Sequence, residues 1–115
     1  MKAGPMNNIR RGNVFWVNFD PSVGSEIKKL RPALVVSNNS ANINSSRIIA
    51  APITSKIKKV YLFEVLVQLP ELQGKILLDQ IKSFDKSRIK EKITSLDYET
   101  MMRVDEALKI ALDLN

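Results

Sequence analysis

The chain has 115 residues, which is enough for one domain with a hydrophobic core and too few for two. It contains no cysteine and no histidine, which excludes disulfides, thiolate or His-bound zinc, and an imidazole base. No apolar run approaches the roughly 20 residues of a membrane helix, so we expect a cytoplasmic protein without a membrane partner.

The charge is distributed unevenly along the chain, whose formal net charge is +6. Residues 1–96 hold sixteen Lys and Arg against seven Asp and Glu, a net of +9, whereas residues 97–115 hold two against five, a net of −3. A basic body favours a polyanion such as nucleic acid, although a highly soluble surface has the same count. No Asp-x-Asp or Asp-x-x-Glu cluster is present to hold Mg²⁺, so we expect any enzyme here to use neither a metal nor a cofactor.

The N-terminal part is predicted to be a short tail followed by a strand. We expect residues 1–8 to be disordered and residues 9–115 to form a single domain. Asn13 to Phe19 reads as a strand because Phe15, Val17 and Phe19 alternate with Val14, Trp16 and Asn18. Asp20-Pro21 ends this strand.

A long loop, Pro21 to Leu30, contains polar and charged side chains, and it comes just before a second, apolar strand at about Pro32 to Ser37. Pro32 disfavours a helical conformation for Arg31, so the guanidinium of Arg31 stands at the entrance of a buried strand. Long loops in small domains are often functional. A solvated loop and a surface arginine fit the same residues equally well.

The middle of the chain is predicted to form further short strands. Pro52 suggests an edge or a bulge in the third strand, and Pro70 and Gly74 are expected to end the fourth. The expected elements are a turn at Asn38–Ser46, strands at 48–54, 61–67, 76–78, 80–84 and 89–94, and a turn or single helical turn at Asp85–Arg88.

From Asp97 onward, apolar residues recur at helical spacing, at Met101, Val104, Leu108, Ala111 and Leu112. Asp97 is a suitable N-cap, and Asp105 with Lys109 is expected to pair one turn apart. Several short strands followed by one amphipathic helix predict a mainly β fold, an SH3-like small barrel.

Several motifs, taken in order and spacing, resemble the MazF/PemK toxins, the endoribonuclease partners in bacterial type II toxin–antitoxin pairs. The resemblance runs from about Arg11 to Leu114. The motifs are Arg11-Gly12-Asn13-Val14, Gly24-Ser25-Glu26, Arg31-Pro32, Ala51-Pro52-Ile53-Thr54-Ser55, Leu77-Leu78-Asp79-Gln80-Ile81-Lys82, Asp85 with Arg88-Ile89, and Val104-Asp105-Glu106-Ala107-Leu108.

The resemblance implies a MazF/CcdB-type barrel with a C-terminal helix, a homodimer, and growth inhibition by metal-independent cleavage of single-stranded mRNA. The products would be a cyclic phosphate and a 5′-hydroxyl, since RNA supplies its own 2′-hydroxyl nucleophile. It also implies a cognate antitoxin, which we expect to be acidic and to cover the basic groove.

Three residues match or border the catalytic positions of that family. Arg31 matches the catalytic arginine, and its planar fork suits clamping of the transition state better than proton donation. Thr54 matches the catalytic hydroxyl. Glu26 is the nearest carboxylate in sequence and is our candidate base, although it could instead simply pair with Lys28 or Lys29.

The remaining expectations concern RNA binding. Gln80 could read a base edge, Lys82 could meet a phosphate, and Phe19 or Trp16 could stack on a base. Met101 and Met102 are expected in the core and the dimer interface. The other predicted RNA-binding residues are Gly24, Ser25, Lys28, Lys29, Ser55 and Lys56.

One departure and two alternative functions stay open. Many family members have a second glycine in the loop where this chain has Ile27-Lys28-Lys29-Leu30, which leaves the RNA sequence that is cut undetermined. A CcdB-like gyrase poison would use the same fold without needing Arg31 or Thr54. A basic nucleic-acid-binding module without catalysis would have the same charge distribution.

Overall fold

The computed structural model describes residues 8–19 and 30–115 of the chain. The predicted tail, apart from Asn8, and residues 21–29 of the loop predicted at 21–30 lie outside the described residues. The same holds for Gly24, Ser25, Glu26, Lys28 and Lys29. In the described part, no helix has both the length and the apolar character needed to cross a membrane.

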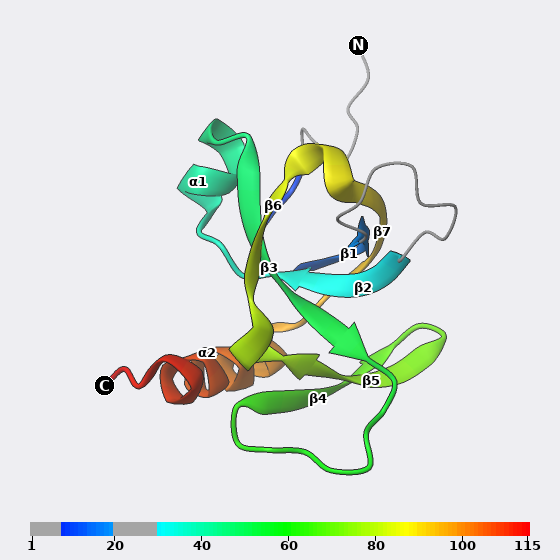
Figure 1. Cartoon of the computed structure of the whole chain (residues 1–115), viewed down its shortest axis with the longest axis vertical. Helices are drawn as coiled ribbons and strands as arrows, with labels where there is room; N and C mark the ends of the chain where they lie inside the picture. The colour runs from blue at the N-terminus through cyan, green and yellow to red at the C-terminus, as the bar shows by residue number, and fades with distance from the viewer. Residues whose placement is uncertain (1–7, 20–29) are drawn as a thin grey trace.

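The described residues form a curled antiparallel sheet with a long helix packed on one side (Figure 1). The strand order is β4-β5-β3-β2-β1-β7, with β6 also paired to β3. This confirms the predicted mainly β, small-barrel fold with a C-terminal helix. The elements are β1 (Asn13–Asn18), β2 (Leu30–Val35), α1 (Asn39–Asn44), β3 (Arg47–Thr54), β4 (Glu64–Leu69), β5 (Leu72–Leu77), β6 (Lys82–Asp85), β7 (Ile89–Ser95) and α2 (Tyr98–Leu112), with 3-10 turns η2 (Leu78–Gln80) and η3 (Lys86–Arg88).

Strand β3 is the central strand of the sheet and pairs with three other strands. Its first half pairs with β6 through Arg47–Ala50, and its end pairs with β5 through Ile53 and Thr54, while β2 runs along its other side. The expectation of an edge at Pro52 is therefore wrong, because β3 has neighbours on both sides. Pro52 lies in the interval between the β6 and β5 ladders, where a residue without an N–H is tolerated.

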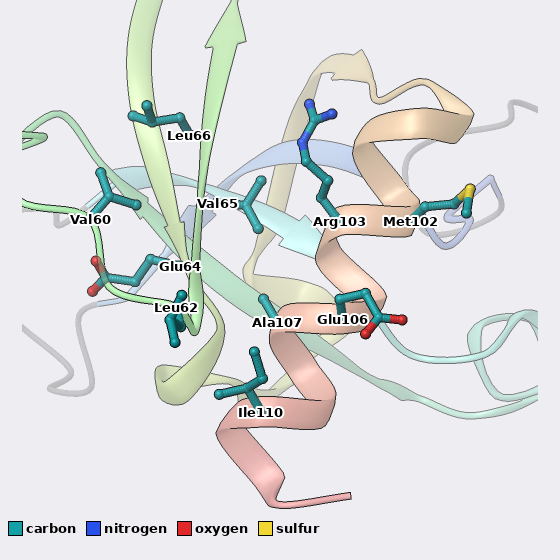
Figure 2. Close-up of a pocket in the computed structure, with 10 residues that line it drawn as sticks. All are labelled: Val60, Leu62, Glu64, Val65, Leu66, Met102, Arg103, Glu106, Ala107 and Ile110. Atoms are coloured by element: carbon teal, nitrogen blue, oxygen red, sulfur yellow. The ribbon is translucent and has the colours of Figure 1, made fainter. Parts of the chain in front are cut away.

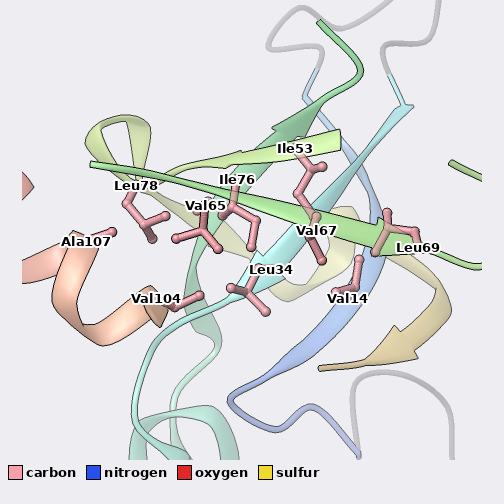
Figure 3. Close-up of a cluster of buried hydrophobic side chains, with 11 residues drawn as sticks. Val14, Leu34, Ile53, Val65, Val67, Leu69, Ile76, Leu78, Val104 and Ala107 are labelled. Atoms are coloured by element: carbon pink, nitrogen blue, oxygen red, sulfur yellow. The ribbon is translucent and has the colours of Figure 1, made fainter. Parts of the chain in front are cut away.

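Two hydrophobic clusters fill the two sides of this sheet, because neighbouring residues of a strand point to opposite faces. In β2, Leu34 belongs to the first cluster, while Ala33 and Val35 belong to the second, so this part of the strand is buried on both faces. Figure 3 shows the first cluster, where Val104 and Ala107 of α2 pack on the sheet. The second cluster joins Phe15, Val17, Ile48, Ala50, Phe84 and Ile89.

The predicted turn at Asn38–Ser46 is wrong for most of its length, because residues 39–44 form α1. The side chain of Asn38 caps this helix by accepting a hydrogen bond from the backbone N–H of Ala41 at 2.8 Å. Buried Asn42 donates to the carbonyl of Ser37 at 2.9 Å. Asn and Ser favour helix caps as well as turns, so the sequence pattern does not distinguish the two.

The predicted fourth strand begins three residues later than expected. The Glu64 N–H donates to the Tyr61 carbonyl at 2.9 Å, and the Tyr61 N–H donates to Glu64 Oε1 at 2.9 Å, so these residues form a turn before β4. Strand β4 continues to Leu69. Gly74 does not end this strand but lies inside β5, so that expectation is wrong. Gln80 belongs to η2 rather than to the strand predicted at 80–84.

Helix α2 begins where the sequence predicts, with the Asp97 carboxylate accepting from the Thr100 N–H at 2.8 Å. The predicted pair of Asp105 with Lys109 is wrong. Asp105 instead binds the Arg11 guanidinium at 2.7 Å, while Lys109 lies 3.5 Å from Glu106. The Arg11 Nε also donates to the Val36 carbonyl at 2.9 Å, which fixes the guanidinium toward the helix.

Gly74 allows β5 to approach the end of β3 closely. A Cβ at this position would lie 2.7 Å from the carbonyl oxygen of Thr54 and 2.9 Å from Cγ2 of Ile53. We therefore expect Gly74→Ala to destabilise the fold by about 1–3 kcal/mol, since backbone must shift to remove the overlap. Chemical denaturation measures the loss, and Gln73→Ala, at an exposed position of the same strand, is the control. Unchanged stability in Gly74→Ala would contradict the close packing of β5 on β3.

Candidate functional site

Arg31 and Thr54, far apart in sequence, are brought to the same face of the sheet. Ala33 of β2 pairs with Pro52 of β3, and two further residues along each strand lead to Arg31 and Thr54. Both therefore share the face of Ala33, which is the side of the second cluster. Arg31 is exposed and Thr54 is half-buried, so both are accessible where this face meets solvent.

The Thr54 hydroxyl is held by its own chain. Its oxygen accepts a hydrogen bond from the backbone N–H of Lys56 at 3.2 Å. A hydroxyl that accepts in this way keeps its O–H as a donor. Thr54 can thus donate one hydrogen bond outward, while exposed Ser55 and Lys56 follow directly after it.

Lys82 and Phe19 lie on the same face as Arg31. Lys82 of β6 pairs with Ala50 of β3, four residues or about 13 Å along the strand from Thr54. Phe19 follows β1 two residues after Val17, which is the partner of Arg31. The Phe19 ring packs edge-on against Phe84, with centroids 4.8 Å apart.

Of two other predicted residues, the structure places Gln80 close in sequence to Lys82 of this group and Trp16 apart from the group. Gln80 is exposed at the end of η2, two residues before Lys82. Trp16 has the opposite strand parity from Val17 and therefore lies on the other face of the sheet. There it lines a separate cleft with Pro32, Pro70 and Ile93, so Trp16 does not belong to the Arg31 face.

Sequence reasoning missed a cleft of about 340 Å³ between the end of β1 and β6, which we call the β6 cleft. It is lined by Phe19, Arg47, Lys82, Ser83, Phe84, Asp85 and Arg88. Asp85 and Arg88 were noted only as family motif residues. Arg47 is the first residue of β3. A cation at the first position of a predicted strand is the sequence feature that could have identified it.

The polar side chains of the β6 cleft are held in place. Arg47 donates to the Ser83 hydroxyl at 2.8 Å and to the Ser83 carbonyl at 3.1 Å. Hydrogen bonds from Ser87 keep the pKa of the Asp85 carboxyl below its ordinary value, and the charges of Arg47 and Arg88 add to this effect. Asp85 is therefore an anion at neutral pH, beside fixed cations.

A buried ion pair holds the segment that follows Thr54. Lys75, which pairs with Thr54 across the sheet, lies 2.8 Å from Glu64, and its ammonium also donates to the Lys59 carbonyl. Glu64 accepts from the Tyr61 N–H, and Lys75 lies over the Tyr61 ring. We call Lys75, Glu64 and these contacts the lysine clamp. It ties residues 59–61 to β5 and so restrains the connection after Thr54.

An apolar groove of about 600 Å³ lies between β4 and α2 (Figure 2). Leu62, Met102 and Ile110 line it, and Leu62 is 80% exposed. Arg103 and Glu106 of α2 also line this groove, so it carries one positively and one negatively charged side chain from the helix. An exposed apolar surface of this kind typically marks a contact with another protein.

The curled sheet, the helix and the basic, aromatic face around Arg31 define a small β-barrel protein equipped to hold a polyanion. Residues 10–112 match the family described as the PemK-like, MazF-like toxin of type II toxin–antitoxin systems. The chain belongs to this family.

Several individual proteins are similar to this chain over most of its length. It is 42% identical over 112 residues to endoribonuclease EndoA of Bacillus subtilis (strain 168), covering 92% of this chain and 96% of that protein. A mycobacterial endoribonuclease has a TM-score of 0.79 and 25% identity, with 95% of each chain covered. MazF of Deinococcus radiodurans, solved as a MazE–MazF structure, has a TM-score of 0.77 and 32% identity, covering 93% of this chain and 97% of that chain.

Proposed function

We propose that this chain is the toxin of a type II toxin–antitoxin pair and cleaves single-stranded RNA, with mRNA as the substrate, without a metal. The observation that carries this proposal is the strand register that puts Arg31 and Thr54 on one accessible face, which also carries Phe19 and Lys82. Family membership and the 42% identity to an endoribonuclease support the reaction.

The chemistry follows from what RNA itself supplies. The 2′-hydroxyl attacks the adjacent phosphorus and loses its proton, while the bond to the 5′-oxygen breaks and that oxygen gains a proton. The products are a cyclic phosphate and a 5′-hydroxyl. The planar fork of Arg31 binds the non-bridging oxygens as charge develops on them, and the Thr54 hydroxyl donates to the same phosphate.

The proton that leaves the 2′-hydroxyl needs an acceptor, and we assign Glu26 to this role. Glu26 lies outside the described residues, so the assignment rests on its position in the Gly24-Ser25-Glu26 motif. Lys28 and Lys29 follow in the same loop and are assigned to backbone phosphates.

The RNA is proposed to run along the face that carries Arg31. Phe19 stacks on a base, Lys82 meets a phosphate and Gln80 contacts a base edge. Ser55 and Lys56 lie next to Thr54 and bind the RNA near the scissile phosphate.

A direct experiment tests the activity. Purified protein is incubated with a long single-stranded RNA in EDTA, and the new 5′ ends are mapped. We expect discrete cuts that carry 5′-hydroxyls. Absence of cuts across varied RNAs would favour the gyrase poison or the plain binding module, neither of which needs Arg31 and Thr54.

A toxin of this kind needs an inhibitor, and we propose an acidic antitoxin segment that covers the basic face. The Deinococcus MazF, whose structure is similar, was solved together with MazE. We propose a cytoplasmic location, which is where an mRNA substrate and a cognate antitoxin would be met. Addition of the small acidic protein encoded beside the gene should abolish the cuts. Uninhibited cleavage would argue against this partner.

The chain is also proposed to act as a homodimer through the β4–α2 groove. In a two-fold contact the same patch meets itself, so Arg103 of one copy can face Glu106 of the other. We expect Ile110→Glu to convert a dimer into a monomer in light scattering. Leu112→Glu, at an exposed position of α2 outside the groove lining, is the control. A dimer that persists in Ile110→Glu would exclude this groove.

A further inference from the structure

We propose that the β6 cleft is a nucleotide subsite that binds one RNA nucleotide beside the scissile phosphate, and that Asp85 there selects a base carrying an amino group. This inference rests on the proposed ribonuclease function. It adds Arg47 and Asp85, which the family resemblance does not place among the RNA-binding residues, to the machinery of substrate selection.

The position of the β6 cleft connects it to the catalytic face. Phe19 belongs to the cleft and is also the diagonal neighbour of Arg31 across the β1–β2 pair, since Val17 is the direct partner of Arg31. Diagonal neighbours across a strand pair lie roughly 7–8 Å apart. A strand of RNA whose phosphate sits at Arg31 therefore reaches the cleft within one or two nucleotides.

The chemistry of the β6 cleft suits a nucleotide. Its aromatic wall is the Phe19 ring, which Phe84 supports edge-on, and the wall offers a surface on which any base can stack. Lys82 lies 5.5 Å from the centre of the Phe84 ring, and Arg47 also lines the cleft. These two cations can bind the phosphates of an RNA strand whose base stacks on the aromatic wall.

Arg47 is prepared for phosphate binding by its own hydrogen bonds. Two of its five N–H donors are used on Ser83, at 2.8 and 3.1 Å, and they fix the plane of the guanidinium. Its remaining donors can bind phosphate oxygens with little further loss of side-chain entropy. A lysine at this position would keep the charge without the fixed plane.

Asp85 supplies the selective element. One of its oxygens, Oδ2, accepts from the Ser87 N–H at 2.9 Å, while a carboxylate offers about four acceptor positions. An ionised carboxylate accepts hydrogen bonds but donates none, so it binds the amino groups of cytosine, adenine or guanine. Uracil has no amino group. Its one base donor, N3–H, lies between two carbonyl oxygens that repel the anion when this N–H faces it. The subsite is therefore expected to disfavour uracil.

The first test is sequencing of the cut sites that the protein makes in an RNA pool of random sequence. Wild-type protein should disfavour uracil by about tenfold at one fixed position near the cut, which corresponds to one charge-assisted hydrogen bond. Asp85→Asn should lose this discrimination, because an amide can donate to a uracil carbonyl, while it still caps the turn at Ser87. Glu99→Gln, on α2, is the matched control and should keep the wild-type pattern.

The second test measures binding to an RNA that is 2′-deoxy at the cut site, as a function of salt. Loss of one phosphate contact lowers the slope of log affinity against log salt by about 0.7 for a single strand. We expect this change in Arg47→Ala and not in Arg47→Lys or in Lys109→Ala, which removes one charge from α2.

The outcomes separate the subsite from the proposed function. If RNA is cut but both Asp85→Asn and Arg47→Ala keep the wild-type pattern and slope, the subsite is wrong and the ribonuclease function stands. If these variants change only inhibition by the antitoxin, the cleft is a protein-binding site and the proposal is overturned. If wild-type protein neither cuts nor binds RNA, both fail together.

Discussion

Arg31→Ala is expected to lower the rate of RNA cleavage by at least 10²- to 10³-fold while RNA affinity falls only modestly, since preorganised donors to a developing oxyanion have effects of this size. Arg31 is exposed at the start of β2, so its removal leaves the two hydrophobic clusters intact. The lost interaction is made mainly in the transition state, where negative charge grows on the phosphate oxygens.

Single-turnover cleavage in EDTA and binding of the 2′-deoxy RNA measure these two effects separately. Arg31→Lys should recover only part of the rate, because an ammonium cannot make the bidentate contact. Lys109→Ala, which removes a cation from α2 outside the groove lining, should cut like wild type. If Arg31→Ala instead lowers affinity and rate by the same factor, Arg31 is a binding residue and the proposed clamp is wrong.

Lys75→Met is expected to destabilise the protein by about 3–5 kcal/mol, because it leaves Glu64 as a buried charge without its partner. The side chains of Lys75 and Glu64 are only 11% and 7% exposed, so water cannot replace the lost contact. For a domain of this size the loss corresponds to a fall in melting temperature of roughly 10–20 °C. Thermal and urea unfolding measure it.

The double variant Lys75→Met with Glu64→Leu provides the control for this prediction. Removal of both charges takes away the uncompensated carboxylate, so the double variant should regain part of the lost stability. It should still cut RNA more slowly than wild type, because residues 59–61 lose their attachment to β5 and the segment after Thr54 is no longer restrained. Additive losses in the two single variants would contradict a coupled ion pair.

The local pattern of the chain was enough to predict several elements and the family. Phe15 and Val17 lie on the same face of β1 because a strand has a period of two. Both belong to the second cluster, as expected. Asp97 caps α2 because a carboxylate can accept the free N–H groups of a first turn. The order of the short motifs identified the toxin family, to which the chain belongs.

Expectations failed where a residue's role depends on a distant neighbour. Gly74 resembles a strand end in sequence, but it is required inside β5 because the Thr54 carbonyl lies against it. Asp105 has a suitable partner one helical turn away, yet Arg11, 94 residues earlier, is already oriented toward it by Val36. Local spacing contains no information about such contacts.

The residues of the candidate site divide in the same way. Arg31 and Thr54 could be selected from motifs, but only the β2–β3 register shows that they share a face, since a shift of one residue would turn one of them to the other side. Arg47 stands in no motif that we recognised and joins Phe19, Lys82 and Asp85 only because β6 pairs with the first half of β3. The sequence by itself determined the family, the strand periods and the helix cap through interactions between near neighbours. The tertiary structure alone decided which polar side chains meet, because strand pairing joins residues that the chain keeps far apart.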